Sequence, residues 1–208
     1  YVLPGTAFIE IIREILTYYY INDLFELHDI MFLVPFIVNE NENKELQTVI
    51  YKKGNSYDFK IISEKSNKRG WNIHVEGNSV PLNNYVKQKI DVAGLLKKFN
   101  KNDKLQNIHP DESIIQIGPR WTNIKHELFK NGNEYLVYFD NSLNFFNDIE
   151  DYYLYPPLLD RGVNALNFKL KEGSYIPLFY KRMIITGPTP KQCYSLLRVH
   201  TNENDRDE

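Results

Sequence analysis

The segment from Thr6 to Tyr20 constrains the fold more than any other part of this 208-residue sequence. It follows Pro4-Gly5, and a proline in the first turn of a helix sacrifices no intrahelical hydrogen bond. Its apolar residues recur at helical spacing, but they cover too wide a surface for a helix with one face in water. They are Phe8, Ile9, Ile11, Ile12, Ile15 and Tyr18 or Tyr19. The sequence therefore predicts a mostly buried helix, as a helix wrapped by a β-sheet would be.

Four strand-like segments follow this helix. The first is rich in Ile, Phe, Val and Leu, and in the other three apolar and polar residues partly alternate, which is typical of strands with one buried face. Turn residues separate them, including the run Asn39–Asn43 and the triplet Gly54-Asn55-Ser56. The expected strands are 24–38, 46–53, 57–64 and 71–77. The first part of the chain is thus expected to be a helix followed by an antiparallel meander.

A similar order of elements recurs after a break in the pattern. Pro156-Pro157 opens a second predicted helix, from Leu158 to about Leu170. Strands are expected at 113–117, 121–129, 134–139, 175–185 and 192–199, and one short helix at 92–99. We expect an α+β fold of two similar halves. The predicted boundaries are a first half at 1–85, a linker at 86–112, a second half at 113–200 and a polar tail at 201–208.

Composition argues against several classes of function. Lys and Arg total 25 against 27 Asp and Glu, so no overall basicity favours nucleic acid. The longest strongly apolar stretch, 31–38, is far shorter than the roughly 20 residues of a membrane span, so no membrane is expected. The one cysteine, Cys193, excludes an intrachain disulfide and fits a reducing cytoplasm. No His pair has the spacing of metal ligands, so no metal site is expected.

Five short stretches resemble, in order, the motifs of polyketide synthase dehydratase domains. Residues 155–164, Tyr-Pro-Pro-Leu-Leu-Asp-Arg-Gly-Val-Asn, resemble the signature HPxLLDxxxQ. Residues 2–8 resemble the end of the motif HxxxGxxxxP with the helix after it, and residues 117–121 are similar to the segment YGPxF. Residues 71–77 and 175–180 resemble two further strands. The resemblance implies a double hotdog, in which two long helices are each wrapped by an antiparallel sheet.

The match to these motifs is incomplete. Asp160 stands at the position of the catalytic Asp. Tyr155 replaces the His of the HP pair, Ile117 replaces the Tyr of YGPxF, and Asn164 replaces the Gln or His of the signature. The His and Gly of HxxxGxxxxP would precede Tyr1, so the first half is expected to be truncated at its N-terminus.

The resemblance implies removal of water from a β-hydroxyacyl thioester. Such domains act on chains carried by the phosphopantetheine arm of an acyl carrier protein, beside neighbouring synthase domains of a modular or hybrid peptide–polyketide synthase. They need no cofactor of their own, and a homodimer is possible. Two alternatives stay open: an enoyl isomerase or ring-forming variant, and a catalytically inactive double-hotdog scaffold.

Asp160 is the candidate general acid, with a His upstream of Tyr1 as base. Apolar neighbours favour a protonated Asp160, whereas a helix start favours the anion, and simple capping of the helix is the plain alternative. Gly5 is a candidate for stabilising the thioester oxygen through its backbone N–H, unless Pro4-Gly5 merely begins the helix. Asn164 lies one helical turn after Asp160 and would orient the carboxyl or the substrate, or only make a polar contact. The resemblance adds further substrate-binding candidates, namely Pro4, Gly118, Pro119 and Tyr155.

Overall fold

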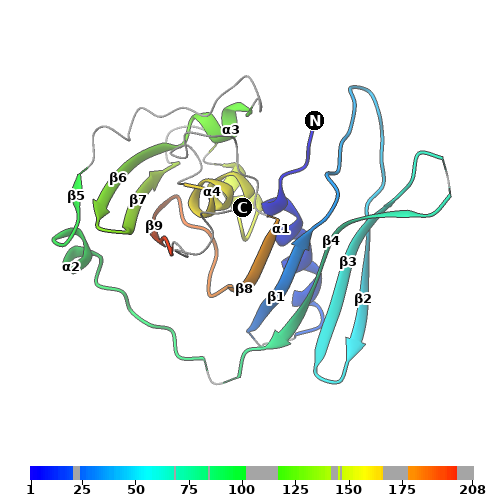
Figure 1. Ribbon diagram of the computed structural model, residues 1–208, viewed down its shortest axis with the longest axis horizontal. Helices are drawn as coiled ribbons and strands as arrows, with labels where there is room; N and C mark the ends of the chain where they lie inside the picture. Colours follow the sequence, from blue (N-terminus) through cyan, green and yellow to red (C-terminus); the bar gives the residue numbers. More distant parts are fainter. Residues whose placement is uncertain are drawn as a thin grey trace, which may run out of the picture. The chain divides into compact units, whose positions relative to one another are not determined.

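The computed structural model describes residues 1–20, 24–67, 69–83, 85–101, 117–141, 145, 147–165 and 178–200. The chain divides into two compact units (Figure 1). The first unit comprises Tyr1–Lys87, Asp151–Pro156 and Tyr175–Pro188, and the second comprises Gln88–Glu150, Pro157–Ser174 and Thr189–Glu208. The chain therefore passes between the units several times.

The first unit contains one long helix and a five-stranded antiparallel sheet. Helix α1 spans Gly5–Thr17. The sheet has the order β2-β3-β4-β1-β8 (Figure 1). Its strands are β1 (Phe25–Phe32), β2 (Gln47–Lys53), β3 (Ser56–Glu64), β4 (Trp71–Pro81) and β8 (Phe179–Ile184). The predicted helix and meander are both present, with ends shifted by a few residues.

Helix α1 packs against this sheet. Ile12 and Leu16 are fully buried, because the apolar surface of the helix covers more than one side. The Phe8 ring stacks on the imidazole of His74 in β4, with ring centroids 6.1 Å apart. Just beyond the helix, the Tyr20 hydroxyl donates to the carbonyl oxygen of Ser79 in β4 at 3.0 Å. The prediction of a buried helix against a sheet is confirmed.

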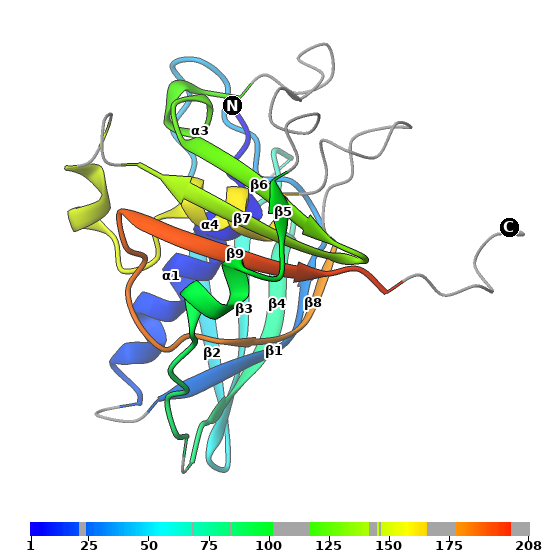
Figure 2. The same ribbon diagram turned by 90° about the vertical axis from the view of Figure 1, so that its left-hand side faces the viewer.

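The second unit has a four-stranded antiparallel sheet of order β5-β6-β7-β9 (Figure 2). Its strands are β5 (Asn100–Lys101), β6 (Lys125–Asn131), β7 (Glu134–Asp140) and β9 (Gln192–Arg198). The short helices are α2 (Val92–Leu96) and α3 (Pro119–Thr122), with a single-turn helix η2 at Asp148–Asp151 and α4 at Pro156–Val163. Helix α4 packs on this sheet, since the Ser195 hydroxyl in β9 donates to the Gly162 carbonyl oxygen at 2.8 Å.

One strand joins a sheet that the sequence does not predict for it. Residues 175–185 were expected in the second half, but β8 pairs with β1 in the first unit, with Met31 opposite Phe179. The contiguous range 113–200 therefore does not form one unit. Alternation of apolar residues predicts that a segment is a strand but does not identify its partner, because any unpaired sheet edge offers the same backbone groups.

Two predicted elements differ locally from the structure. The strand expected at 121–129 begins only at Lys125, because Gly118-Pro119 starts the short helix α3 through Trp121 and Thr122. Helix α4 ends at Val163, short of Leu170, and residues 166–170 lie outside the described residues. Most of the strand predicted at 113–117 lies outside them as well, as do residues 175–177.

Candidate active site

Asp160 stands at the centre of a small polar cluster in the second unit. Its Oδ2 accepts a hydrogen bond from the indole Nε1 of Trp121 at 2.9 Å. Its Oδ1 accepts one from the side-chain amide of Asn164 at 2.8 Å. Asn164 directly follows the last residue of α4, and its backbone N–H still donates to the Asp160 carbonyl oxygen at 2.9 Å, so its side chain lies one helical turn from Asp160. The two donors hold both carboxyl oxygens, so the side chain has a defined orientation.

The Trp121 side chain reaches Asp160 from helix α3. That helix begins where Gly118 is extended and Pro119 occupies the first helical position. Gly118 and Pro119 are themselves exposed. The structure therefore brings Asp160, Asn164 and the segment from 118 to 121 together. The sequence pointed to this segment, but it did not single out Trp121 as the residue that contacts the carboxyl.

The surroundings of Asp160 favour its protonated form. Burial raises the pKa of the Asp160 carboxyl above its ordinary value. The hydrogen bonds from Trp121 and Asn164 and the positive charge of Arg161 act in the opposite direction, and burial outweighs them. Of the two opposing influences that the sequence leaves open, desolvation is the stronger. A carboxyl that keeps its proton above its ordinary range suits a general acid.

Arg161 follows Asp160 and is buried, with 7% of its surface exposed. Its Nη2 lies 3.2 Å from Nδ1 of His126 in β6. Burial lowers the pKa of the Arg161 guanidinium, and the charge of Asp160 raises it. Neither Arg161 nor His126 was predicted as a site residue. The only signal for Arg161 in the sequence was its position inside a mostly apolar predicted helix, because a charged side chain that is buried there needs a polar partner.

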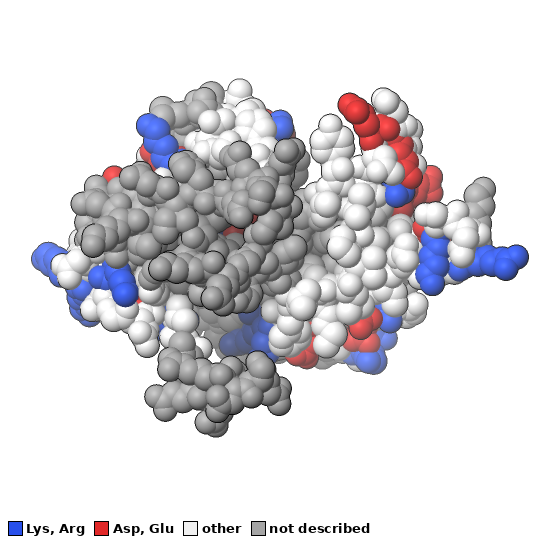
Figure 3. Space-filling view, turned by 45° about the horizontal axis from the view of Figure 1, so that its top comes forward, with Lys and Arg blue, Asp and Glu red and all other residues white. Residues whose placement is uncertain are grey.

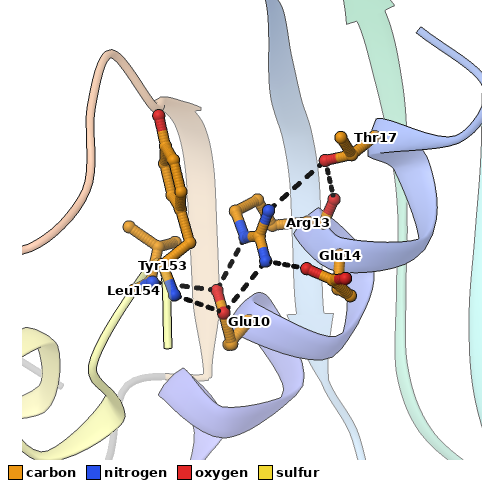
Figure 4. A network of polar contacts seen from close by, with 6 residues as sticks. All are labelled: Glu10, Arg13, Glu14, Thr17, Tyr153 and Leu154. Carbon is orange, nitrogen blue, oxygen red and sulfur yellow. Dashed lines mark hydrogen bonds and ion pairs between the residues drawn. The ribbon is translucent and has the colours of Figure 1, made fainter. Parts of the chain in front are cut away.

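Within the first unit, a polar network on α1 holds the segment that includes Tyr153 and Leu154 (Figure 4). Glu10, 8% exposed, accepts hydrogen bonds from the backbone N–H groups of Tyr153 and Leu154 at 2.9 and 3.0 Å. The guanidinium of Arg13 donates to both oxygens of Glu10 at 2.8 and 3.0 Å. In addition, the Thr6 hydroxyl donates to the Pro156 carbonyl oxygen at 3.1 Å. Helix α1 thereby fixes the backbone of residues 153–156.

The remaining predicted site residues lie in the first unit. Pro4 is extended and precedes α1, which has no side-chain N-cap. A Cβ atom on Gly5 would lie 3.0 Å from the Phe32 ring, so close packing already explains a glycine there. The Tyr155 side chain is 1% exposed, with its ring centroid 5.9 Å from that of Tyr152. Contact of these residues with substrate remains a prediction.

Further observations on the described residues concern metal ligands, the cysteine, surface charge and membrane-spanning helices. Among them no three His, Cys, Asp or Glu side chains gather closely enough to hold a metal ion. Burial raises the pKa of the Cys193 thiol to about 11, so the reactive thiolate is scarce at neutral pH. Both acidic and basic side chains are seen among the described residues in the view of Figure 3. No helix in the described ranges is long and apolar enough to cross a membrane.

Each unit combines a helix with an antiparallel sheet, which is the composition of a hotdog module. The family model for the polyketide synthase dehydratase domain matches residues 1–64. The chain is similar to the dehydratase domain from the CurK module of the curacin polyketide synthase. The identity is 23% and the TM-score 0.82, over 96% of this chain and 74% of that one.

Two further solved structures have the same fold. The dehydratase domain from the CurF module of the curacin synthase is 20% identical, with a TM-score of 0.83 over 97% of this chain and 75% of that one. A dehydratase domain of a trans-AT polyketide synthase from Brevibacillus brevis is 18% identical, with a TM-score of 0.81 over 98% and 75%. No curated protein matches the chain. The resemblance to polyketide synthase dehydratase domains is confirmed, and the chain has their α+β double-hotdog fold.

Proposed function

We propose that this chain is a dehydratase domain of a modular or hybrid polyketide synthase, and that it removes water from a β-hydroxyacyl thioester on an acyl carrier protein. The observation that carries the proposal is the Asp160 carboxyl, whose pKa is raised by burial and whose oxygens are oriented by Trp121 and Asn164. The fold supports the same reaction class, since the similar solved structures are dehydratase domains of such synthases.

In the proposed reaction Asp160 is the general acid. A base takes the α-proton of the thioester, and the electron pair of the α-carbon–hydrogen bond becomes the second bond between the α- and β-carbons. The bond from the β-carbon to its hydroxyl breaks, and the proton of Asp160 passes to that oxygen, which leaves as water. Asp160 is left as a carboxylate, whose charge the donors Trp121 and Asn164 stabilise.

The base in this proposal is a His that the resemblance places nine positions before Pro4. Two solved structures support the need for both groups in a related domain. They are described as inactive mutants of the CurK dehydratase, one with His replaced by Phe and one with Asp replaced by Asn. We propose that the Asp160 carboxyl corresponds in role to such an Asp, and that backbone N–H groups near Gly5 polarise the thioester.

The test is a dehydration assay on the parent protein that contains this chain, with a β-hydroxyacyl thioester and product analysis by mass spectrometry. Asp160→Ala should lower the rate at least about 100-fold, because the leaving hydroxyl loses its proton donor. Asp151→Ala, at an exposed carboxyl, is the matched control and should retain the rate. Full activity in Asp160→Ala, or a product that keeps the water, contradicts the proposal.

A further inference from the structure

The two hydrogen bonds to Asp160 differ in kind. Trp121 Nε1 lies 2.9 Å from Oδ2, and an indole nitrogen can only donate. The nitrogen of the Asn164 amide lies 2.8 Å from Oδ1. An amide can turn over and present its oxygen as an acceptor, whereas an indole has no acceptor to present. The two oxygens of Asp160 are therefore not equivalent once the carboxyl carries a proton.

We propose that Trp121 is a positioning residue that keeps the acidic proton of Asp160 on Oδ1. A proton on Oδ2 would make that oxygen an O–H donor and a poorer acceptor for the indole N–H that already faces it. A proton on Oδ1 has the Asn164 amide oxygen, or a substrate oxygen, to accept it. The effect of Trp121 on catalysis rests on the proposed function. The position of the proton on the Asp160 carboxyl does not depend on it.

The donor is a feature of this chain rather than of the motif that residues 117–121 resemble. That motif ends in Phe, whose ring has no N–H, and this chain has Trp121 at the same place. The ring lies in the short helix α3, which begins at Pro119. A change from Phe to Trp there adds one hydrogen-bond donor directed at the carboxyl, while the aromatic surface is kept.

Charged groups around the carboxyl do not replace this contact. Arg161 on the same helix contributes a positive charge and faces His126 in β6. On α3, Arg120 pairs with Asp148, with Nε and Oδ2 2.5 Å apart. Loss of the Trp121 donor removes a contact that favours the anion, so the pKa of Asp160 should rise further in Trp121→Phe.

The direct test is the pH titration of indole N–H signals by NMR on the whole, isotope-labelled chain. The chain has two tryptophans, Trp71 and Trp121, so the variant Trp121→Phe assigns both signals. We expect the Trp121 signal to move as Asp160 ionises, at a pH above the ordinary 3.8 of such a carboxyl, and not to move in Asp160→Asn. A Trp121 signal that does not titrate, or that titrates equally in Asp160→Asn, overturns the inference.

A kinetic test on the parent protein complements the titration. Trp121→Phe should lower kcat about tenfold with little change in KM, and should move the high-pH limb of the kcat profile to higher pH. Trp71→Phe is the matched control, because Trp71 lies on β4 with 48% of its surface exposed. A profile of Trp121→Phe equal to that of the wild type contradicts the inference.

The two proposals can fail separately. A protein that removes no water, but whose Trp121 signal follows the ionisation of Asp160, contradicts the proposed function and supports the contact between Trp121 and Asp160 on which the placement of the proton depends. A protein that dehydrates its substrate, but whose Trp121 signal is independent of Asp160, supports the proposed function and contradicts the placement.

Discussion

The buried carboxylate of Glu10 offers the sharpest test of how the first unit is held together. Glu10→Ala removes the acceptor for two backbone N–H groups, of Tyr153 and Leu154, and for the guanidinium of Arg13 (Figure 4). The Arg13 side chain is only 8% exposed, so water cannot readily replace the lost partner. Arg13 keeps its contact with Glu14, but the two backbone N–H groups lose their acceptor, and each buried donor left without a partner costs about 1–3 kcal/mol. We therefore expect the free energy of unfolding to fall by about 4 kcal/mol.

The measurement is urea-induced unfolding at neutral pH, followed by circular dichroism. Glu14→Ala is the matched control, because Glu14 contacts the same guanidinium but is 58% exposed. An exposed ion pair contributes at most about 1 kcal/mol, so this variant should unfold close to the wild-type midpoint. If Glu10→Ala is destabilised no more than Glu14→Ala, the reasoning from the buried network is refuted.

Three further outcomes follow from the structure. Asp160→Asn should gain stability relative to the wild type as pH rises above 3.8. The pKa of Asp160 is higher in the folded than in the unfolded chain, so its contribution to the free energy of unfolding is lost as pH rises through the folded-state pKa. Equal thermal midpoints of the two proteins at every pH contradict this. Gly77→Ala should cost about 1–3 kcal/mol in urea, because the new Cβ would lie 2.7 Å from the Phe59 ring and 3.0 Å from the His28 carbonyl oxygen; an unchanged midpoint contradicts it. Alkylation of Cys193 in the folded chain should be slow at neutral pH and rise toward pH 11; rapid labelling at neutral pH opposes the raised pKa.

Periodic features of the sequence predicted the elements well. The wide apolar surface of residues 6–20 predicted a buried helix, and the structure buries Ile12 and Leu16 completely. The turn residues 54–56 marked the hairpin between β2 and β3, where Gly54 has a positive φ of 57°. Such features depend only on residues that are close together along the chain, so they can be predicted from one sequence.

Other features of the site depend on partners distant in sequence. The motif resemblance pointed to Asp160 and Asn164, which are four residues apart. It gave no reason to expect the hydrogen bond from Trp121, which lies 39 positions away. Nor did it indicate that Glu10 would bind backbone groups 143 and 144 positions further on. An acidic residue in an apolar helix was visible, but the groups that satisfy it were not.

The sequence by itself determined that this chain forms two sets of antiparallel strands with two Pro-initiated helices, because spacing of apolar residues and turn chemistry are local properties. Only the tertiary structure decided which sheet β8 would complete, and that desolvation outweighs the stabilising donors around Asp160. The pairing of β8 and the raised pKa of Asp160 both depend on which groups of the folded chain surround a residue and exclude water from it. That is a property of chain segments packed in space, and a linear pattern of residues does not contain it.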